Sequence, residues 1–563
     1  MNPVTRQEKL RRLVQTKSFS VVIIGAGING AGVYRDCALQ GLNVLLIDKS
    51  DFCSGASSAP SRMIHGGLRY LENGEFSLVK ESLKERNLLL QNAPHYVKPL
   101  VTTIPLFYKF SGILNAVKTF LGFNAKPSAR GSYVVKLGLL LYDFFTLKNQ
   151  TLPKHTFDSD KKSKEKWPQL NKNIVCTATY HDAWVSYPER LCLEVIEDVE
   201  SNENAIAINY LEFVKSAEES IVLRDLINDV DIEVSTKIVI NASGPWIDFS
   251  NRKMNFESNL IGGTKGSHLV INNAELFEAT KGNMIYYEAP GGRICILFPF
   301  MGNIIAGTTD IAVESPNVDC TNGEIKYILK SLSHVFPNIK ISEKEIIFHY
   351  CGVRPLPKSD SQITGKISRS HQCIESESHD AQAYKIFSLV GGKWTTFRSF
   401  SEEVTNKILT ELKLKRIVST ENKRIGGGKS FPITEAECIK FLKDLNIETK
   451  FSDAKLNLLF ERYGTKLKSI IEYILLEDDA PLKSLGTYSI REIKFIMIYE
   501  NVCHLDDVVI RRTSIAIKGE CTKELIREIS SIAKIIFGWS DEVTLLEADR
   551  CREVLKNKHG VDI

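Results

Sequence analysis

Two short stretches of this chain place histidine, arginine and lysine side chains beside paired glycines. They are residues 61–71 (SRMIHGGLRYL) and residues 391–398 (GGKWTTFR), and a further arginine follows a glycine in residues 350–356 (YCGVRPL). Histidine exchanges protons near neutral pH, and the arginine fork matches the oxygens of a phosphate. A glycine-rich helix start can bind an anion through its free N–H groups. We interpret these stretches as loops of a functional site, with a surface turn as the alternative for residues 61–71.

Residues 19–48 carry the pattern that would position such a site. A run of valine and isoleucine is followed at once by Gly25, Gly27 and Gly30, then by a helical stretch and a second apolar run that ends at Asp48. The three glycines allow a tight turn, close approach to a pyrophosphate, and close packing of helix on strand. Asp48 stands where an acid can bind a ribose hydroxyl. The pattern predicts a dinucleotide site for NAD or FAD and disfavours a 2′-phosphate.

Small residues recur at two later points and predict further close approaches of the backbone to the ligand. Residues 52–58 (FCSGASS) follow the second strand of the unit, and residues 241–246 (NASGPW) end another strand-like segment. Side chains this short let the main chain lie against a flat ring system. We expect both segments to line the dinucleotide site.

Composition excludes several classes of protein. The chain has 563 residues, 43% of them hydrophobic and 25% charged, which is typical of a globular protein of two to four domains. A net charge of +4 gives no support for nucleic-acid binding. None of the 12 cysteines forms a C-x-x-C pair, so we expect no metal site and free thiols in a reducing compartment. No apolar run approaches the ~20 residues of a membrane span. Residues 1–17 are basic and we interpret them as a solvated lead-in helix, with contact to anionic lipid or a targeting remnant as the alternatives.

The interval between Glu85 and Asp143 is basic and amphipathic. It contains no acidic residue and seven basic ones, while apolar residues recur at helical spacing. The apolar positions are Phe110, Ile113, Leu114, Val117, Phe120 and Leu121, with a second, more apolar piece over 133–145. This combination is typical of helices that lie on an anionic bilayer. A helix packed on its own core is the alternative.

The rest of the chain divides by composition. Residues 151–175 and 421–430 (ENKRIGGGKS) are polar and read as exposed connections, and residues beyond 430 are mostly helical. Further motifs are residues 265–268 (KGSH), 307–310 (GTTD) and 506–513 (DDVVIRRT).

These motifs, in this order, resemble the FAD-dependent glycerol-3-phosphate dehydrogenases over residues 18–400 and through the helical C-terminal region. The resemblance implies an α/β fold with a discontinuous, glutathione-reductase-like FAD-binding domain, an inserted β-rich substrate domain and an α-helical C-terminal domain. The boundaries we expect are 18–105, 176–255 and 350–405 for the first, 106–175 and 256–349 for the second, which also faces the membrane, and 430–563 for the third. The chain departs from the commonest pattern at Asp48, where glutamate is frequent, and at Phe397, where tyrosine is frequent.

The resemblance also assigns roles within the site. Arg354 and Arg69 would bind the substrate phosphate, with Lys393 as a second cation. His65 is the first choice for the base and His268 the second, while Tyr70, Thr309 and Lys265 would contact the substrate. The residues expected to contact FAD are Gly25, Gly27, Asn29, Gly30, Asp48, Ser57, Ser58, Ser61, His65, Gly66, Gly67, Leu68, Gly244, Pro245, Trp246, Gly392 and Thr395.

The activity that the resemblance implies is oxidation of sn-glycerol 3-phosphate to dihydroxyacetone phosphate, with hydride transfer to FAD and electrons passed to membrane quinone. The nearest alternative is an oxidase that passes electrons to O₂ and makes hydrogen peroxide. An amine or amino-acid oxidase of the same fold and a non-enzymatic FAD-binding scaffold are more distant readings. We expect a peripheral protein on the cytoplasmic face of the plasma or inner membrane, or a cytoplasmic one, in preference to the mitochondrial inner membrane. A homodimer is left open.

Overall fold

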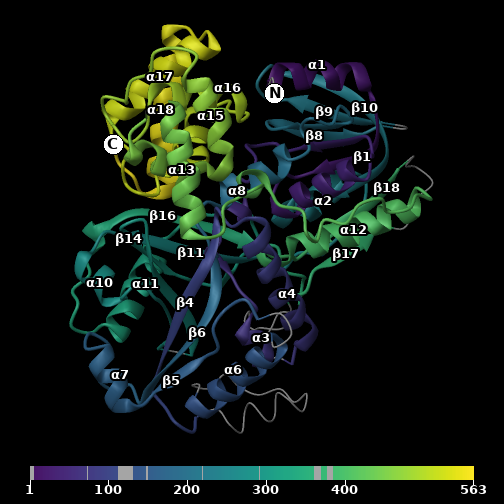
Figure 1. The fold of residues 1–563 in the computed structure, drawn as a ribbon. Coiled ribbons are helices and arrows are strands. Elements are labelled where there is room, and N and C mark those ends of the chain that lie inside the picture. Colours follow the sequence, from purple (N-terminus) through teal and green to yellow (C-terminus); the bar gives the residue numbers. More distant parts are fainter. Residues whose placement is uncertain are drawn as a thin grey trace.

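The computed structural model describes residues 5–72, 74–111, 131–146, 150–217, 220–290, 292–359, 369–376, 384–449 and 451–563. Two β-sheets lie one above the other along the molecule, and the C-terminal helices pack beside the junction between them (Figure 1). The chain passes between the sheets several times, so each sheet is assembled from segments far apart in the sequence.

The first sheet carries the glycine-rich turn. Within the described residues it has eight strands, and its central five are parallel. In spatial order they are β18 (Lys385–Val390), β10 (Val230–Asn241), β1 (Ser18–Ile24), β2 (Val44–Ile47) and β7 (Ala205–Ile208), with β17 (Gln372–Glu375) antiparallel at the edge and β8 (Leu211–Ser216) and β9 (Ile221–Asp225) as a hairpin on β10. Strands β1 and β2 are almost wholly buried, as continuous apolar runs in a parallel sheet require.

Helices cover both faces of this sheet. One face packs against α2 (Ile28–Leu39), α8 (Pro188–Glu197) and α12 (Phe397–Glu411). The other packs against α1 (Arg6–Thr16), α9 (Ile247–Lys253) and the hairpin. The lead-in segment is helical as expected, but it is not simply solvated, because Leu13 is fully buried in this second core. Coverage on both faces explains why the strands show no polar alternation.

The second sheet has ten strands among the described residues. They are β15 (Ile311–Ala312), β11 (Thr264–Ile271), β14 (Asn303–Gly307), β13 (Arg293–Phe300), β12 (Met284–Ala289), β4 (Val97–Leu106), β6 (Cys176–Val185) and β3 (Met63–Ile64), with β16 (Ile346–Arg354) paired to β11 and β5 (Thr156–Asp158) to β6. The predicted boundaries cut this sheet, because β4 and β6 pair with each other along their whole length and β4 pairs in parallel with β12. The strand pairing therefore places both with the β-rich part rather than with the dinucleotide unit.

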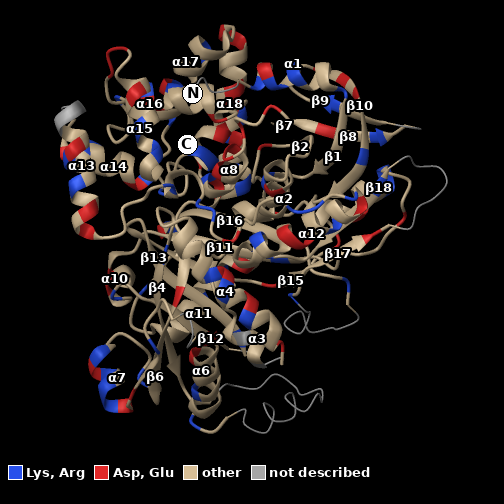
Figure 2. Ribbon diagram, turned by 45° about the vertical axis from the view of Figure 1, so that its right-hand side comes forward, with Lys and Arg blue, Asp and Glu red and all other residues tan. Residues whose placement is uncertain are grey.

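Two groups of helices pack on the second sheet. At one end lie α7 (Asp160–Lys166), α10 (Ala274–Ala279) and α11 (Asn322–Val335). At the other lie α3 (Leu68–Glu72), α4 (Phe76–Asn92) and α6 (Ser132–Thr146). Figure 2 shows α7 densely charged and α6 mostly uncharged. The reading of 151–175 as an exposed connection is wrong in part, because Trp167, Leu170 and Ile174 are buried in the core beneath α11.

The C-terminal region forms a helical domain, as expected. Its helices are α13 (Glu435–Thr449), α14 (Asp453–Tyr463), α15 (Leu467–Ile474), α16 (Ile490–Tyr499), α17 (Lys523–Phe537) and α18 (Asp541–His559), with a π-helical turn η9 (Asp507–Arg512) between α16 and α17. One apolar cluster joins these helices to residues of the second sheet such as Phe298 and Phe348. The mixed α/β class with a helical C-terminal domain is confirmed.

The glycine-rich segment 421–430 is not an exposed linker. Gly427 and Gly428 are buried, and the Gly427 N–H donates to Glu194 Oε2 over 3.0 Å. A Cβ at Gly427 would lie 2.1 Å from the carbonyl oxygen of Tyr463, so only glycine allows this close approach. The glycine-rich composition predicted that this segment is neither helix nor strand, but it could not show that the segment is buried between two domains.

Candidate functional site

The glycine-rich turn has the geometry that its sequence predicts. Gly25 adopts φ 105°, and a Cβ there would lie 2.6 Å from the carbonyl oxygen of Ala242. A Cβ at Gly30 would lie 1.9 Å from the carbonyl oxygen of Gly25. Substitution at either position would therefore separate α2 from β1 and β10. The N-cap of α2 is Gly27, which offers no side chain, and the Ile28 N–H in the first turn donates to Ser57 Oγ over 3.0 Å.

A cavity of about 620 Å³ opens beside this turn. Its walls include many of the residues predicted to contact the cofactor: Gly25, Gly27, Asn29, Asp48, Ser57, Ser58, Gly244, Pro245 and Trp246. The other predicted contacts are not among its lining residues: Gly30, Ser61, His65, Gly66, Gly67, Leu68, Gly392 and Thr395. The volume is in the range of cofactor sites.

The polar groups of this cavity suit a dinucleotide. Asp48 Oδ2 accepts from the Ala26 N–H over 2.8 Å and Oδ1 from the Ser50 N–H over 2.9 Å, and burial raises the pKa of this carboxyl to about 6. Each carboxylate oxygen can accept a second bond, such as one from a ribose hydroxyl. The Asn29 side-chain oxygen is buried without a protein partner and lines the same cavity. A helix N-terminus suits the pyrophosphate of such a ligand, and the Asn29 oxygen suits one of its O–H or N–H donors.

His65 lies where two predicted loops meet. Its backbone N–H donates to Thr395 Oγ1 over 3.2 Å, and its ring centroid is 5.9 Å from that of Tyr70. The Lys393 ammonium is 4.4 Å from the centre of the Tyr70 ring and donates to Ser82 Oγ over 2.8 Å. Burial lowers the pKa of Lys393. The structure thus brings residues 61–71 and 391–398 together into one site.

A buried polar network holds the glycine after His65. The Gly66 N–H donates to Tyr142 Oη over 2.8 Å and to Asp182 Oδ1 over 3.2 Å. Tyr142 Oη in turn donates to Asp182 Oδ1 over 2.5 Å, and Arg86 pairs with the same oxygen over 3.0 Å. Burial raises the pKa of both Tyr142 and Asp182. Sequence reasoning missed this network, whose members come from α6, β6 and α4.

Arg354 ends β16 opposite Thr264 of β11, and its side chain lies over Gly266 of the same strand. A Cβ at Gly266 would lie 2.2 Å from Arg354 Nη2, so the glycine makes room for the guanidinium. Arg354 pairs with Asp310 Oδ1 over 3.1 Å and donates to Thr308 Oγ1 over 3.1 Å. These bonds fix the direction of the guanidinium. Neither Asp310 nor Gly266 was predicted to act on Arg354, although both lie in motifs that the sequence analysis identified.

His268 is enclosed rather than exposed to a ligand. Its Nε2 lies 2.9 Å from Ser61 Oγ, and its ring stacks on Tyr350 with centroids 5.0 Å apart. Burial, with Arg354 and Arg62 nearby, lowers the pKa of His268 to about 3. A base with so low a pKa is a poor proton acceptor at neutral pH.

Lys265 and Thr309 converge on Glu324 at the start of α11. The Lys265 ammonium is 2.6 Å from Glu324 Oε2, and Thr309 Oγ1 donates to Oε1 over 2.7 Å. Although burial opposes ionisation, these contacts lower the pKa of Glu324 to about 2. Both predicted substrate contacts are therefore engaged by a buried carboxylate.

One backbone hydrogen bond joins the two halves of the site. The Gly391 N–H donates to the Pro355 carbonyl over 2.9 Å, and Asn29 Nδ2 donates to the Gly391 carbonyl over 3.3 Å. Arg354 immediately precedes Pro355, and Lys393 follows Gly391 by two residues, so this bond joins the two segments that carry the predicted cations. The bond from Asn29 ties both segments to the dinucleotide turn. The side chain of Arg69, the remaining predicted cation, lies outside the described residues.

Comparisons with known proteins agree with this arrangement. A family model described as FAD dependent oxidoreductase matches residues 20–379, and one described as the C-terminal domain of alpha-glycerophosphate oxidase matches residues 418–544. A glycerol-3-phosphate dehydrogenase of Synechocystis is 32% identical over 530 residues, covering 89% of this chain and 90% of that protein. An aerobic glycerol-3-phosphate dehydrogenase of Bacillus subtilis is 27% identical, covering 88% and 87%. A solved glycerol-3-phosphate dehydrogenase of Bacillus halodurans with FAD shares the fold, with TM-score 0.74, 21% identity, and coverage of 99% and 98%.

Proposed function

Because the chain belongs to the family of FAD-dependent glycerol-3-phosphate dehydrogenases, we propose that it oxidises sn-glycerol 3-phosphate to dihydroxyacetone phosphate and passes the electrons to membrane quinone. FAD is the cofactor, and when bound it accepts the hydride from C2 of the substrate. The protein's part is to hold the phosphate, orient C2 and remove a proton.

The observation that carries this proposal is the placement of two fixed cations, Lys393 over the Tyr70 ring, which lies beside that of His65, and Arg354 over Gly266 of β11. Arg354 is directed by Asp310, and Lys393 by Ser82 and the face of Tyr70. A guanidinium with five N–H donors can serve both a carboxylate and a phosphate. Hydrogen bonds to charged groups contribute about 1.5–3 kcal/mol each, so two such contacts suffice to select the phosphate ester over free glycerol.

We assign proton removal from the C2 hydroxyl to His65. The alternative, His268, has its ring enclosed by Ser61 and Tyr350 and a pKa of about 3, which makes it a weak base at working pH. His65 lies beside Tyr70 and Thr395, next to the cation that would hold the phosphate. Tyr70 keeps Lys393 in place and gives the substrate one apolar wall.

The substrate assignment is tested by anaerobic reduction of the bound flavin. Purified holoprotein should lose its yellow absorbance when sn-glycerol 3-phosphate is added and should keep it with glycerol, sarcosine or an amino acid. Loss of absorbance with an amino acid instead would favour the amine-oxidase reading. A yellow, folded protein that no tested compound reduces would overturn the proposed activity.

The acceptor is tested on the same reduced protein. We propose a quinone, so reoxidation by a water-soluble quinone analogue should be much faster than reoxidation by air. The alternative is an O₂-linked oxidase, and the family description of residues 418–544 gives that alternative its support. Fast reoxidation in air with stoichiometric hydrogen peroxide would establish the oxidase instead.

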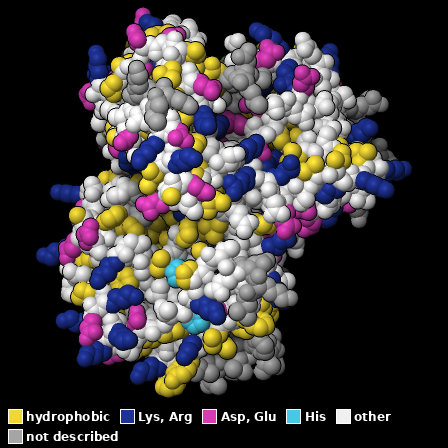
Figure 3. Space-filling model, in the orientation of Figure 1, with side chains coloured by type: hydrophobic (Ala, Val, Ile, Leu, Met, Phe, Trp, Pro, Cys, Tyr) yellow, Lys and Arg dark blue, Asp and Glu magenta, His cyan; other side chains and the backbone are white. Residues whose placement is uncertain are grey.

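We further propose that the α6 end of the molecule contacts an anionic bilayer. Large apolar side chains of α6 and of the segment that follows β4 are exposed: Tyr108, Phe110, Tyr133, Leu137, Leu140 and Phe144. Figure 3 shows hydrophobic side chains gathered at the lower end of the molecule, where α6 lies. Of the apolar positions in the predicted first piece, Phe110 is described and the other five lie outside the described residues. No helix in the described part of the chain is long and apolar enough to cross a membrane.

A further inference from the structure

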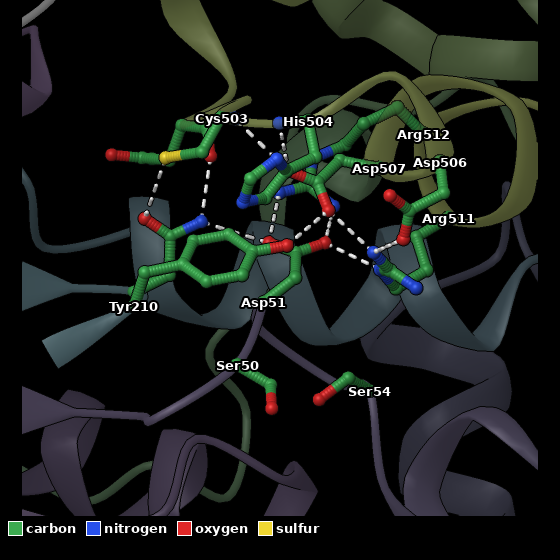
Figure 4. A network of polar contacts seen from close by, with 12 residues as sticks. Ser50, Asp51, Ser54, Tyr210, Cys503, His504, Asp506, Asp507, Arg511 and Arg512 are labelled. Carbon is green, nitrogen blue, oxygen red and sulfur yellow. Dashed lines mark hydrogen bonds and ion pairs between the residues drawn. The ribbon is translucent and has the colours of Figure 1, made fainter. Parts of the chain in front are cut away.

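The motif at residues 506–513, to which the catalytic reading gives no role, makes a dense set of buried contacts with the dinucleotide unit. Arg512 donates to both oxygens of Asp51 over 2.7 Å, and Arg511 Nε donates to Asp51 Oδ2 over 2.6 Å (Figure 4). Asp51 stands three residues after Asp48, on the segment that leaves β2. Asp51, which is 1% exposed, is therefore one of the points at which the C-terminal domain holds the dinucleotide domain.

The network extends on both sides of Asp51. Asp507 Oδ1 accepts from Tyr210 Oη over 2.6 Å, and its Oδ2 accepts from the backbone N–H groups of Cys503 and His504. Asn209 Nδ2 reaches Asp51 Oδ1 over 2.9 Å. Burial opposes ionisation of Asp51, but Arg512 and Arg511 outweigh it and hold its pKa well below the usual range. Burying such an ion pair costs a large desolvation free energy. Removing one partner is strongly destabilising, because it leaves the other charge buried and unpaired.

The turn that carries Asp48 is fixed by the same set of residues. The Tyr210 N–H donates to the Ser50 carbonyl over 3.0 Å, while the Ser50 N–H donates to Asp48 Oδ1 over 2.9 Å. Figure 4 shows Ser50 and Ser54 beneath Asp51, with Tyr210 alongside. The position of Asp48 at the cavity therefore depends on groups that η9 holds from the other side.

The C-terminal domain also forms part of the cavity wall. Its lining residues from this domain are Ile510, Arg511, Ile517, Val554, Lys558 and His559. His559 is stacked on Phe348 with ring centroids 4.4 Å apart and bonds to the His349 carbonyl, so the end of α18 is fixed on β16. A ligand bound at Gly27 and Asp48 would be enclosed by this wall.

We propose that the η9 motif positions the FAD site: Arg511 and Arg512 hold Asp51, and through it the Asp48–Ser50 turn, while the C-terminal domain closes the cavity. Arg512 is then a positioning residue for cofactor binding and not a catalytic residue. The proposal rests on FAD as the cofactor and is independent of the substrate, because it concerns cofactor affinity alone.

The test compares two Arg→Lys variants of the same domain. Arg512→Lys keeps the charge but removes the fork on Asp51. Arg462→Lys is the matched control, since Arg462 is also buried and its Nη1 donates to both oxygens of Glu492 inside the C-terminal domain, at 2.9 and 3.1 Å. FAD is titrated into each apoprotein, and quenching of flavin fluorescence gives the dissociation constant. We expect at least tenfold weaker FAD binding for Arg512→Lys and wild-type binding for Arg462→Lys.

A purely structural role would give a different result. It would lower the melting temperatures of apoprotein and holoprotein alike and leave the FAD-induced rise unchanged, whereas a positioning role reduces that rise only in Arg512→Lys. If Arg512→Lys fails to fold, Tyr210→Phe replaces it in the test. This variant removes one hydroxyl from the network without changing any charge, and it should weaken FAD binding by a smaller factor. Wild-type FAD affinity in the folded Arg512 variant, or in Tyr210→Phe when that variant must stand in, would overturn the proposal. Equal weakening in Arg512→Lys and Arg462→Lys would do the same.

Discussion

At the scale of the residue, His268 gives a stability prediction with a defined sign. Its pKa is about 3 in the folded chain against about 6.5 for a free histidine, so folding favours the neutral ring. That stabilisation is present above pH 6.5 and is lost as pH falls toward 3. Between pH 7 and pH 5 the free energy of unfolding of the wild-type chain should fall by about 2 kcal/mol more than that of His268→Gln. Thermal unfolding at the two pH values measures this, and parallel pH profiles for the two proteins would contradict it.

His65 gives a second prediction at this scale. His65→Asn should retain FAD, because the histidine contacts Thr395 through its backbone, but flavin reduction by glycerol 3-phosphate should slow by about 100-fold or more. Stopped-flow absorbance measures the reduction, and His268→Gln serves as comparison. Should His268→Gln lose reduction while His65→Asn keeps it, the two assignments must be exchanged.

The residues expected to contact FAD could be gathered from the sequence more readily than those expected to contact the substrate. The glycines and Asp48 could be placed because a local strand–turn–helix unit fixes them, and nine of the predicted contacts line the cavity. Lys265 and Thr309 could not be placed in the same way. Their partner Glu324 comes from α11, and a contact across that distance depends on strand register that no local pattern records.

At the scale of the element, α6 contacts the site with one face and presents the other outward. Leu139 and Tyr142 are buried against α3 and α4, and Tyr142 bonds to Gly66, whereas Leu137, Leu140 and Phe144 are exposed. Spacing predicted the apolar helix, but not which face would be inside. Tyr142 carries no local signal of its role, because its partner Asp182 lies on β6.

The hydroxyl of Tyr142 therefore has a testable effect on catalysis. Tyr142→Phe removes the hydroxyl that accepts from the Gly66 N–H and donates to Asp182. We expect flavin reduction to slow by about tenfold, because a looser Gly66 turn would hold the reacting groups less precisely. FAD affinity should be unchanged. The control is Tyr133→Phe on the exposed face of the same helix. Equal reduction rates in both variants would remove Tyr142 from the positioning network.

At the scale of the whole molecule, the C-terminal helices and the exposed face of α6 lie far apart (Figure 1). The C-terminal helices pack at the junction of the sheets and reach the dinucleotide cavity, while α6 lies at the opposite end (Figure 1). The sequence predicted that the chain beyond residue 430 is mostly helical, and it is. It could not show that these helices join the cofactor site, because Asp51 and Arg512 are brought together only by the packing of two domains.

Contact of α6 with the bilayer depends on its exposed apolar side chains. The double variant Leu140→Glu, Phe144→Glu adds charge to the outer face of α6 and should lower partition onto vesicles of phosphatidylglycerol and phosphatidylcholine by well over tenfold. Burial of one such side chain contributes about 1.5–3 kcal/mol. The matched control is Leu545→Glu, Leu546→Glu on α18, whose leucines are 67% and 61% exposed against 51% and 64% on α6. Co-sedimentation measures the partition. Since the interval from Glu85 to Asp143 is basic, wild-type binding should also weaken as salt rises. If only the α18 variant lost binding, the bilayer would lie against the C-terminal helices, and the proposal that α6 contacts the membrane would be wrong.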